Sequence, residues 1–94
     1  MEVYIDELED ANDAFDYINE NALDVEFKDS DYGTYRGAII TLTYGGPTVT
    51  FDTWNGCVEY YDGNEYEYDY VSKNVADMFD EACRELFFES KDRE

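Results

Sequence analysis

The residues in this chain that could carry chemistry are carboxylates. The chain has 25 Asp and Glu against 6 Lys and Arg, and it has no histidine, so its formal net charge is -19. Paired carboxylates can act as general acid and base, but they need a cleft that holds two pKa values apart, and 94 residues around one sheet leave little room for one. No glycine loop is suited to phosphate, and no base is positioned beside Cys57, Cys83 or a serine. We therefore expect no enzymatic activity, no catalytic residue and no cofactor.

A dedicated metal site is not expected either. The segment Asp29-Ser30-Asp31-Tyr32-Gly33 looks like a fragment of a calcium loop, but an EF-hand needs glycine at its sixth position and glutamate at its twelfth. Here the glycine is fifth and the twelfth residue is Ile40. Two cysteines without histidine are too few ligands for zinc, and Cys57 and Cys83 are expected to be a buried, reduced pair.

The composition predicts one folded domain over residues 1–94. Hydrophobic residues make up 44% of the chain and aromatic residues 18%, whereas disordered acidic chains are poor in both. No apolar run approaches the ~20 residues that span a bilayer, and the acidic start is unlike a signal peptide. We expect no contact with membrane and a cytoplasmic location, which is the host-cell cytoplasm if the gene belongs to a phage.

The hydrophobic periodicity predicts a helix, a meander of strands and a second helix. A stripe with spacings of three and four places the first helix at roughly residues 6–20, and a similar stripe follows a possible cap at Ser72. Between them, apolar residues alternate in short runs separated by turns at 29–33, 45–47, Asn55-Gly56 and Asp62-Gly63. Asn55-Gly56 is typical of a tight hairpin turn because both residues tolerate positive φ. We expect an α+β, two-layer fold, an antiparallel sheet of four to five strands with an N-terminal and a C-terminal helix packed on it.

The acidic residues are concentrated in separate parts of the chain. Residues 2–31 hold 12 acids and one base, residues 37–58 hold a single acid, and residues 59–69 hold five acids and no base. Clustered like charges repel one another and destabilise the folded state, so this clustering is expected to serve a function. Salt adaptation, weak cation binding and imitation of a polyanion are the three possibilities. Carboxylates fixed at high density could occupy the Lys- and Arg-lined channel of a DNA-binding protein, and the tyrosines would add rigid contact area.

The segment Asp62-Gly63-Asn64-Glu65-Tyr66, followed by a short polar strand and an amphipathic helix, resembles part of a known family. These are the small acidic prophage-encoded anti-CRISPR proteins that inhibit Cas9 by mimicking DNA. Their order of elements is similar too: an N-terminal helix, a three-stranded antiparallel sheet, then helices. In that family the Asp and Glu of the matching turn occupy the Cas9 pocket that reads the PAM, so the resemblance implies this role for Asp62 and Glu65. The chain departs from the family by an extra strand pair around residues 45–61 and by one long final helix.

The function that these observations favour is a DNA-mimicking inhibitor of a host defence nuclease. Its partner would be a basic nucleic-acid-binding protein, such as a Cas effector, and it would not bind nucleic acid directly. The alternative is a salt-adapted acidic structural domain, or an adaptor that binds another basic protein. The predicted contact residues lie on the hairpin and on the first helix: Asp62, Glu65, Glu67, Asp69, Glu59, Asp13, Asp16 and Glu20.

Overall fold

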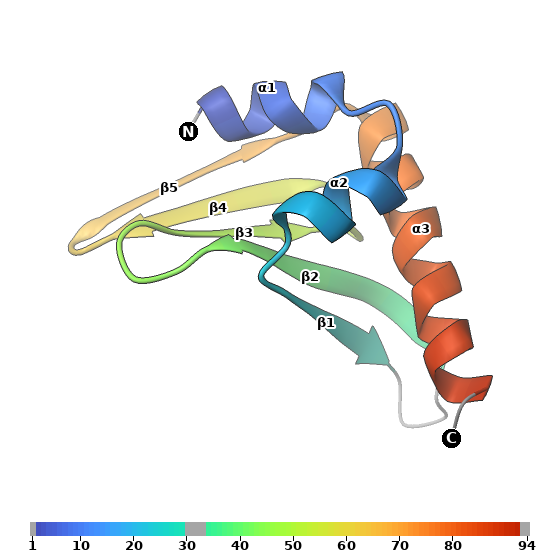
Figure 1. The fold of residues 1–94 in the computed structure, drawn as a ribbon. Helices are drawn as coiled ribbons and strands as arrows, with labels where there is room; N and C mark the ends of the chain where they lie inside the picture. Colours follow the sequence, from blue (N-terminus) through green and yellow to red (C-terminus); the bar gives the residue numbers. More distant parts are fainter. Residues whose placement is uncertain (1, 30–33, 93–94) are drawn as a thin grey trace.

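The fold is an α+β arrangement in which three helices pack on a five-stranded antiparallel sheet (Figure 1). The computed structural model describes residues 2–29 and 34–92. The elements follow in the order α1 (Glu2–Asp10), α2 (Ala14–Asn21), β1 (Asp24–Asp29), β2 (Tyr35–Thr43), β3 (Thr48–Asp52), β4 (Cys57–Asp62), β5 (Glu65–Tyr70) and α3 (Lys73–Asp92). The expected fold class is confirmed.

The sheet is a simple meander in the order β1-β2-β3-β4-β5, so β1 and β5 are its two edges. The expected turns at 45–47, 55–56 and 62–63 all join neighbouring strands. The turn at Asn55-Gly56 is wider than a two-residue hairpin turn. Gly56 has a φ of +68°, but Asn55 does not have positive φ. The Asp52 carboxylate accepts hydrogen bonds from the backbone N–H groups of Trp54 and Asn55, which stabilises this wider turn. The expected turn and calcium-loop fragment at 29–33 lie outside the described residues, except for Asp29.

The expectation of one continuous N-terminal helix over residues 6–20 is wrong, because the chain forms two helices there. Asp13 is extended, with φ -141° and ψ 120°, and it is the N-cap of α2. Its Oδ1 accepts hydrogen bonds from the backbone N–H groups of Phe15, at 2.8 Å, and Asp16, at 3.3 Å. An aspartate that caps in this way satisfies N–H groups that a new helix start leaves free, so the break at residues 11–13 is stabilised locally.

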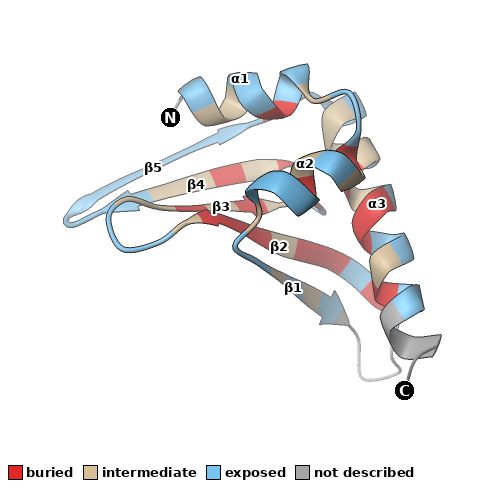
Figure 2. Cartoon of the chain, in the orientation of Figure 1, coloured by how far each residue is buried: buried red, intermediate tan, exposed pale blue. Residues whose placement is uncertain are grey.

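The core lies between the helices and one face of the sheet, which we call the inner face. Residues directly opposite each other in a sheet share a face, so the register pairs of Ile40 with Phe51 and Phe51 with Val58 define it. All three are fully buried, and Phe51 and Phe79 of α3 pack with ring centroids 5.3 Å apart. Figure 2 shows the buried residues on β2 to β4 and on the helix sides that face them, whereas β5 is exposed along its whole length. At the β5 edge, the sheet thus extends beyond the hydrophobic core.

A buried polar cluster attaches α3 to the sheet. The Tyr35 hydroxyl donates a hydrogen bond to Asp80 Oδ1 at 2.7 Å, and the Thr53 hydroxyl donates to the same oxygen at 3.0 Å. Thr53 Oγ1 also accepts from the backbone N–H of Ala38 at 3.1 Å. Burial raises the pKa of Tyr35 above its usual range, so the phenol stays protonated and remains a donor. Asp80 is therefore a structural carboxylate.

Candidate partner-binding surfaces

The outer part of the β4–β5 hairpin is the longest continuous run of exposed residues in the described chain. All ten residues from Tyr61 to Tyr70 are exposed, and Asp62 is paired in register with Glu65 across the tip. Gly63 has a φ of +60°, while Asn64 does not have positive φ. This combination fits the two-residue type II′ turn, which takes glycine at its first central position and matches the twist of the strands. The short turn therefore holds the two predicted tip carboxylates side by side.

The tip carboxylates form no salt bridge with any side chain that the structure describes. Asp62 Oδ2 accepts a long hydrogen bond, 3.4 Å, from the Tyr60 hydroxyl. Among the side chains that the structure describes, the single salt bridge joins Lys28 and Asp52 at 3.8 Å. The charge of Asp62 and Glu65 is thus available to a partner.

Glu67 and Asp69 continue this acidic surface along β5. Glu67 is paired in register with Tyr60, and Asp69 with Val58, which places both on the inner face beyond the edge of the core. Asp69 Oδ1 also accepts from the backbone N–H of Tyr70 at 2.7 Å. We use the name hairpin carboxylates for Asp62, Glu65, Glu67 and Asp69.

Glu59 lies on the opposite face of the hairpin from Glu67 and Asp69. It is paired in register with Tyr68, and its Oε2 accepts a 2.6 Å hydrogen bond from the Tyr61 hydroxyl. This bond, followed by desolvation and the negative charge of Glu59, raises the pKa of Tyr61 to about 12. The structure therefore separates Glu59 from the other predicted residues of the hairpin.

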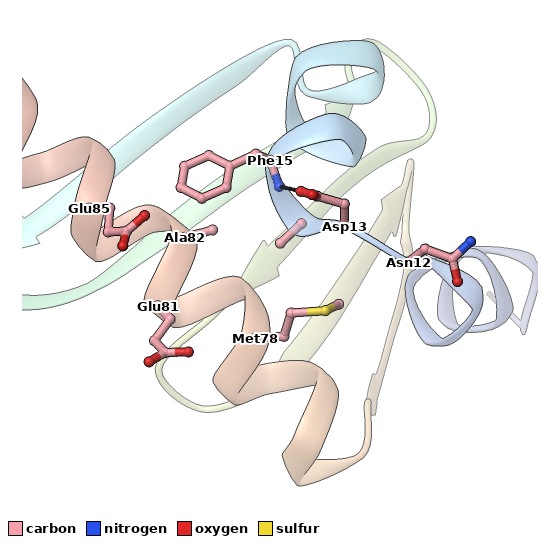
Figure 3. A pocket seen from close by; sticks show the side chains of 8 residues that line it. Asn12, Asp13, Phe15, Met78, Glu81, Ala82 and Glu85 are labelled. Carbon is pink, nitrogen blue, oxygen red and sulfur yellow. Dashed lines mark hydrogen bonds between the residues drawn. The ribbon is translucent and has the colours of Figure 1, made fainter.

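The remaining predicted residues lie on α2, away from the hairpin tip (Figure 1). Asp16 and Glu20 are exposed on the helix surface, whereas the carboxylate of Asp13 is engaged as the N-cap. Figure 3 shows Asp13 at the edge of a hollow of about 310 Å³ between α2 and α3, with Phe15, Met78 and Ala82 among its lining residues and Glu81 and Glu85 on α3. A change at Asp13 would affect folding as well as charge, so Asp16 and Glu20 are the better test of this surface.

Tyrosines form a row on the face of the hairpin that carries Glu59. We call this row the tyrosine ladder, and its members are Tyr61, Tyr66, Tyr68 and Tyr70. The ring centroids of successive members are 4.8, 5.9 and 6.0 Å apart. The alternation of residues 66, 68 and 70 was visible in the sequence, but Tyr61 joins the row only through its register pair with Tyr66. The ladder adds an aromatic surface to the acidic one.

Within residues 2–29 and 34–92, no group of three or more Cys, Asp or Glu is placed to hold a metal ion. None of the described helices has the length and apolar character needed to cross a bilayer. Comparison with protein-family models, with curated proteins and with solved structures found no match to this chain.

Proposed function

We propose that this protein is a DNA-mimicking inhibitor of a host defence nuclease, acting in the cytoplasm of the host cell. The hairpin carboxylates would enter the channel or PAM-reading pocket of the nuclease and pair with the arginines and lysines that otherwise hold DNA. The observation that carries the proposal is the exposed and un-neutralised row of four carboxylates on one hairpin.

The spacing of this row supports the proposal. Residues of an antiparallel strand rise ~3.4 Å each, so Glu65 to Asp69 spans ~14 Å, and Asp62 adds a charge opposite Glu65 without adding length. The carboxylates therefore repeat every ~6.8 Å along β5, which is one charge for every two ~3.4 Å phosphate steps of a single DNA strand, with a second charge from Asp62 at the tip. Because the hairpin is stiffened by its tight turn and strand pairing, the charges need little ordering upon binding.

The position of the two tip carboxylates also supports the proposed function. Arginines that read guanine form two hydrogen bonds to acceptor atoms in the major groove, and a carboxylate offers two acceptor oxygens to the same guanidinium. Asp62 and Glu65 are placed at the hairpin tip, where side chains can enter a recessed basic pocket. A Cas9-type effector, which reads its PAM through such arginines, is accordingly the first nuclease to test.

If the proposal is correct, the affinity for the nuclease will fall steeply with salt. Binding that rests on about four charge pairs should weaken roughly ten- to a hundredfold between ~50 and ~200 mM NaCl, because ions screen the pairs and counterions are released from the channel. Isothermal titration of the guide-loaded nuclease across the salt series measures this slope. Thermal melts at each salt concentration control for changes in folding, and an affinity that does not change with salt would contradict the proposal.

A further inference from the structure

The tyrosine ladder lies in an acidic hollow on the face of the sheet opposite the core. The hollow has a volume of about 380 Å³ and is lined by Asp52, Asn55, Cys57, Glu59, Tyr66, Tyr68 and Tyr70. Glu59 lies within it, paired in register with Tyr68, and Asp52 is paired with Cys57. Half or more of the surface of Tyr66 and Tyr68 is exposed, 50% and 57%. The rings of Tyr66 and Tyr68 are therefore available to a ligand beside Glu59, whereas the Asp52 carboxylate is already engaged by Trp54, Asn55 and Lys28.

Tyrosines on an open sheet face can stack nucleobases, but the charges here oppose that use. Proteins that bind single-stranded nucleic acid combine aromatic rings with a positively charged groove that follows the phosphates. Glu59 and Asp52 line this hollow, and the one described cation in a salt bridge, Lys28, pairs with Asp52. With a net charge of -19 on the whole chain, a phosphate backbone is repelled and a cation is attracted.

Among cations, the arrangement favours arginine over lysine. A guanidinium is planar, so it can stack on a tyrosine ring while its N–H groups donate two hydrogen bonds to a carboxylate such as Glu59. An ammonium group is compact and more strongly hydrated, and it makes neither a planar stack nor a bidentate pair. Alternate side chains of an extended peptide lie ~7 Å apart, close to the 5.9 and 6.0 Å between successive rings from Tyr66 to Tyr70.

We propose that the tyrosine ladder binds an extended segment of the protein partner with arginines at alternate positions. Their guanidinium groups stack on Tyr66 and Tyr68, and Glu59 accepts their hydrogen bonds. This inference rests on the proposed function in that the partner is a basic protein. The tyrosine ladder is then a second contact face, opposite Glu67 and Asp69, and it selects arginine side chains.

Two synthetic peptides of equal length and charge test the preference, one alternating arginine with serine and the other alternating lysine with serine. At ~150 mM NaCl we expect the arginine peptide to bind about three- to tenfold more tightly, since only the planar guanidinium both stacks on a ring and forms a bidentate pair with a carboxylate. The double variant Tyr66→Leu with Tyr68→Leu should remove this preference, while Tyr66→Phe with Tyr68→Phe, which keeps the rings, should retain most of it. Tyr44→Leu is the matched control, because Tyr44 is 61% exposed but lies outside the ladder.

The unmodified protein provides a second measurement that needs no variant. Cys57 lines the hollow, whereas Cys83 is fully buried, and both thiols are free. Burial raises the pKa of both thiols, so alkylation is followed at mildly alkaline pH, where arginine remains charged. The arginine peptide should slow the alkylation of Cys57 several-fold.

Three results would overturn the ladder proposal: equal affinity for the two peptides, a preference that survives the leucine variant, or unchanged alkylation of Cys57. Tighter binding of an oligothymidylate than of the arginine peptide would overturn it as well. None of these results bears on the hairpin carboxylates, so the ladder can fail while nuclease inhibition stands. Conversely, an arginine preference in a protein that inhibits no nuclease would support the ladder and overturn the proposed function.

Discussion

Replacing both tip carboxylates, Asp62→Ala with Glu65→Ala, is expected to weaken nuclease inhibition by one to several decades. Charge pairs that become desolvated in an interface lose ~2–5 kcal/mol when one partner is truncated, and ~1.4 kcal/mol corresponds to a factor of ten. The free protein should be almost unaffected, because both side chains are exposed and such surface changes shift the free energy of unfolding by less than ~0.5 kcal/mol. The measurement is the inhibition constant against the guide-loaded nuclease, with a thermal melt of each variant.

The matched control for this variant is Asp16→Ala with Glu20→Ala. It removes the same two charges from an exposed surface of α2, and alanine is favourable within a helix. If inhibition depended only on total charge, the two double variants would be equally weak. If the hairpin variant inhibited normally and the α2 variant did not, the contact surface would be α2, and the assignment of Asp62 and Glu65 would be wrong.

The second large effect is expected at Asp80, where alanine should destabilise the fold by ~2–3 kcal/mol. The substitution removes the carboxylate that both buried hydroxyls share and leaves them only longer hydrogen bonds, from Tyr35 to the Asp80 carbonyl at 3.3 Å and from Thr53 to the Ala38 carbonyl at 3.4 Å. A hydrogen bond to a charged group contributes ~1.5–3 kcal/mol. In a domain of this size, each kcal/mol shifts Tm by ~4–8 °C, so Tm should fall by ~10–20 °C. Asp80→Asn keeps an acceptor oxygen and should cost less.

Asp77→Ala is the control for the charge that Asp80→Ala removes. Asp77 is exposed on the same helix, and losing one of many acids relieves some repulsion, so this variant should melt at or slightly above the temperature of the unmodified protein. If the free energy of unfolding of the Asp80→Ala protein lies within ~0.5 kcal/mol of that of the Asp77→Ala protein, the hydrogen bonds of Tyr35 and Thr53 do not stabilise α3 on the sheet.

The strands were predictable because their side chains alternate strongly. Ala38, Ile40 and Leu42 are buried on the inner face as the pattern indicated, and glycine at position 63 allowed the hairpin turn to be predicted. The exposure of Asp62 and Glu65 followed from their place at the tip of that turn.

The division of the N-terminal segment into two helices was not predicted, because two local signals conflict there. The spacing of Leu8, Phe15 and Ile18 continues across residues 11–13, but Asp13 competes for the backbone N–H groups and starts a new helix. Hydrophobic periodicity gives more weight to the apolar stripe than to a single cap, so it predicted one helix in place of two.

The tyrosine ladder was only partly predictable. A two-residue turn fixes the register of its hairpin, so the pairing of Tyr61 with Tyr66 could have been deduced from Asp62-Gly63-Asn64-Glu65 alone. The hollow beside the ladder could not, because Asn55 reaches it through the widened β3–β4 turn. That turn depends on hydrogen bonds from the backbone to one side chain, which residue patterns do not specify.

The most direct test of DNA mimicry is a competition between this protein and DNA for the same nuclease. A fluorescently labelled duplex that carries the PAM and target is bound to the guide-loaded Cas9-type effector, and this protein is titrated in while anisotropy is followed. Competition for one site requires that the duplex is released completely, and that the concentration needed for half release rises linearly with the duplex concentration. A nuclease that binds this protein and still binds the duplex with unchanged affinity would contradict the account.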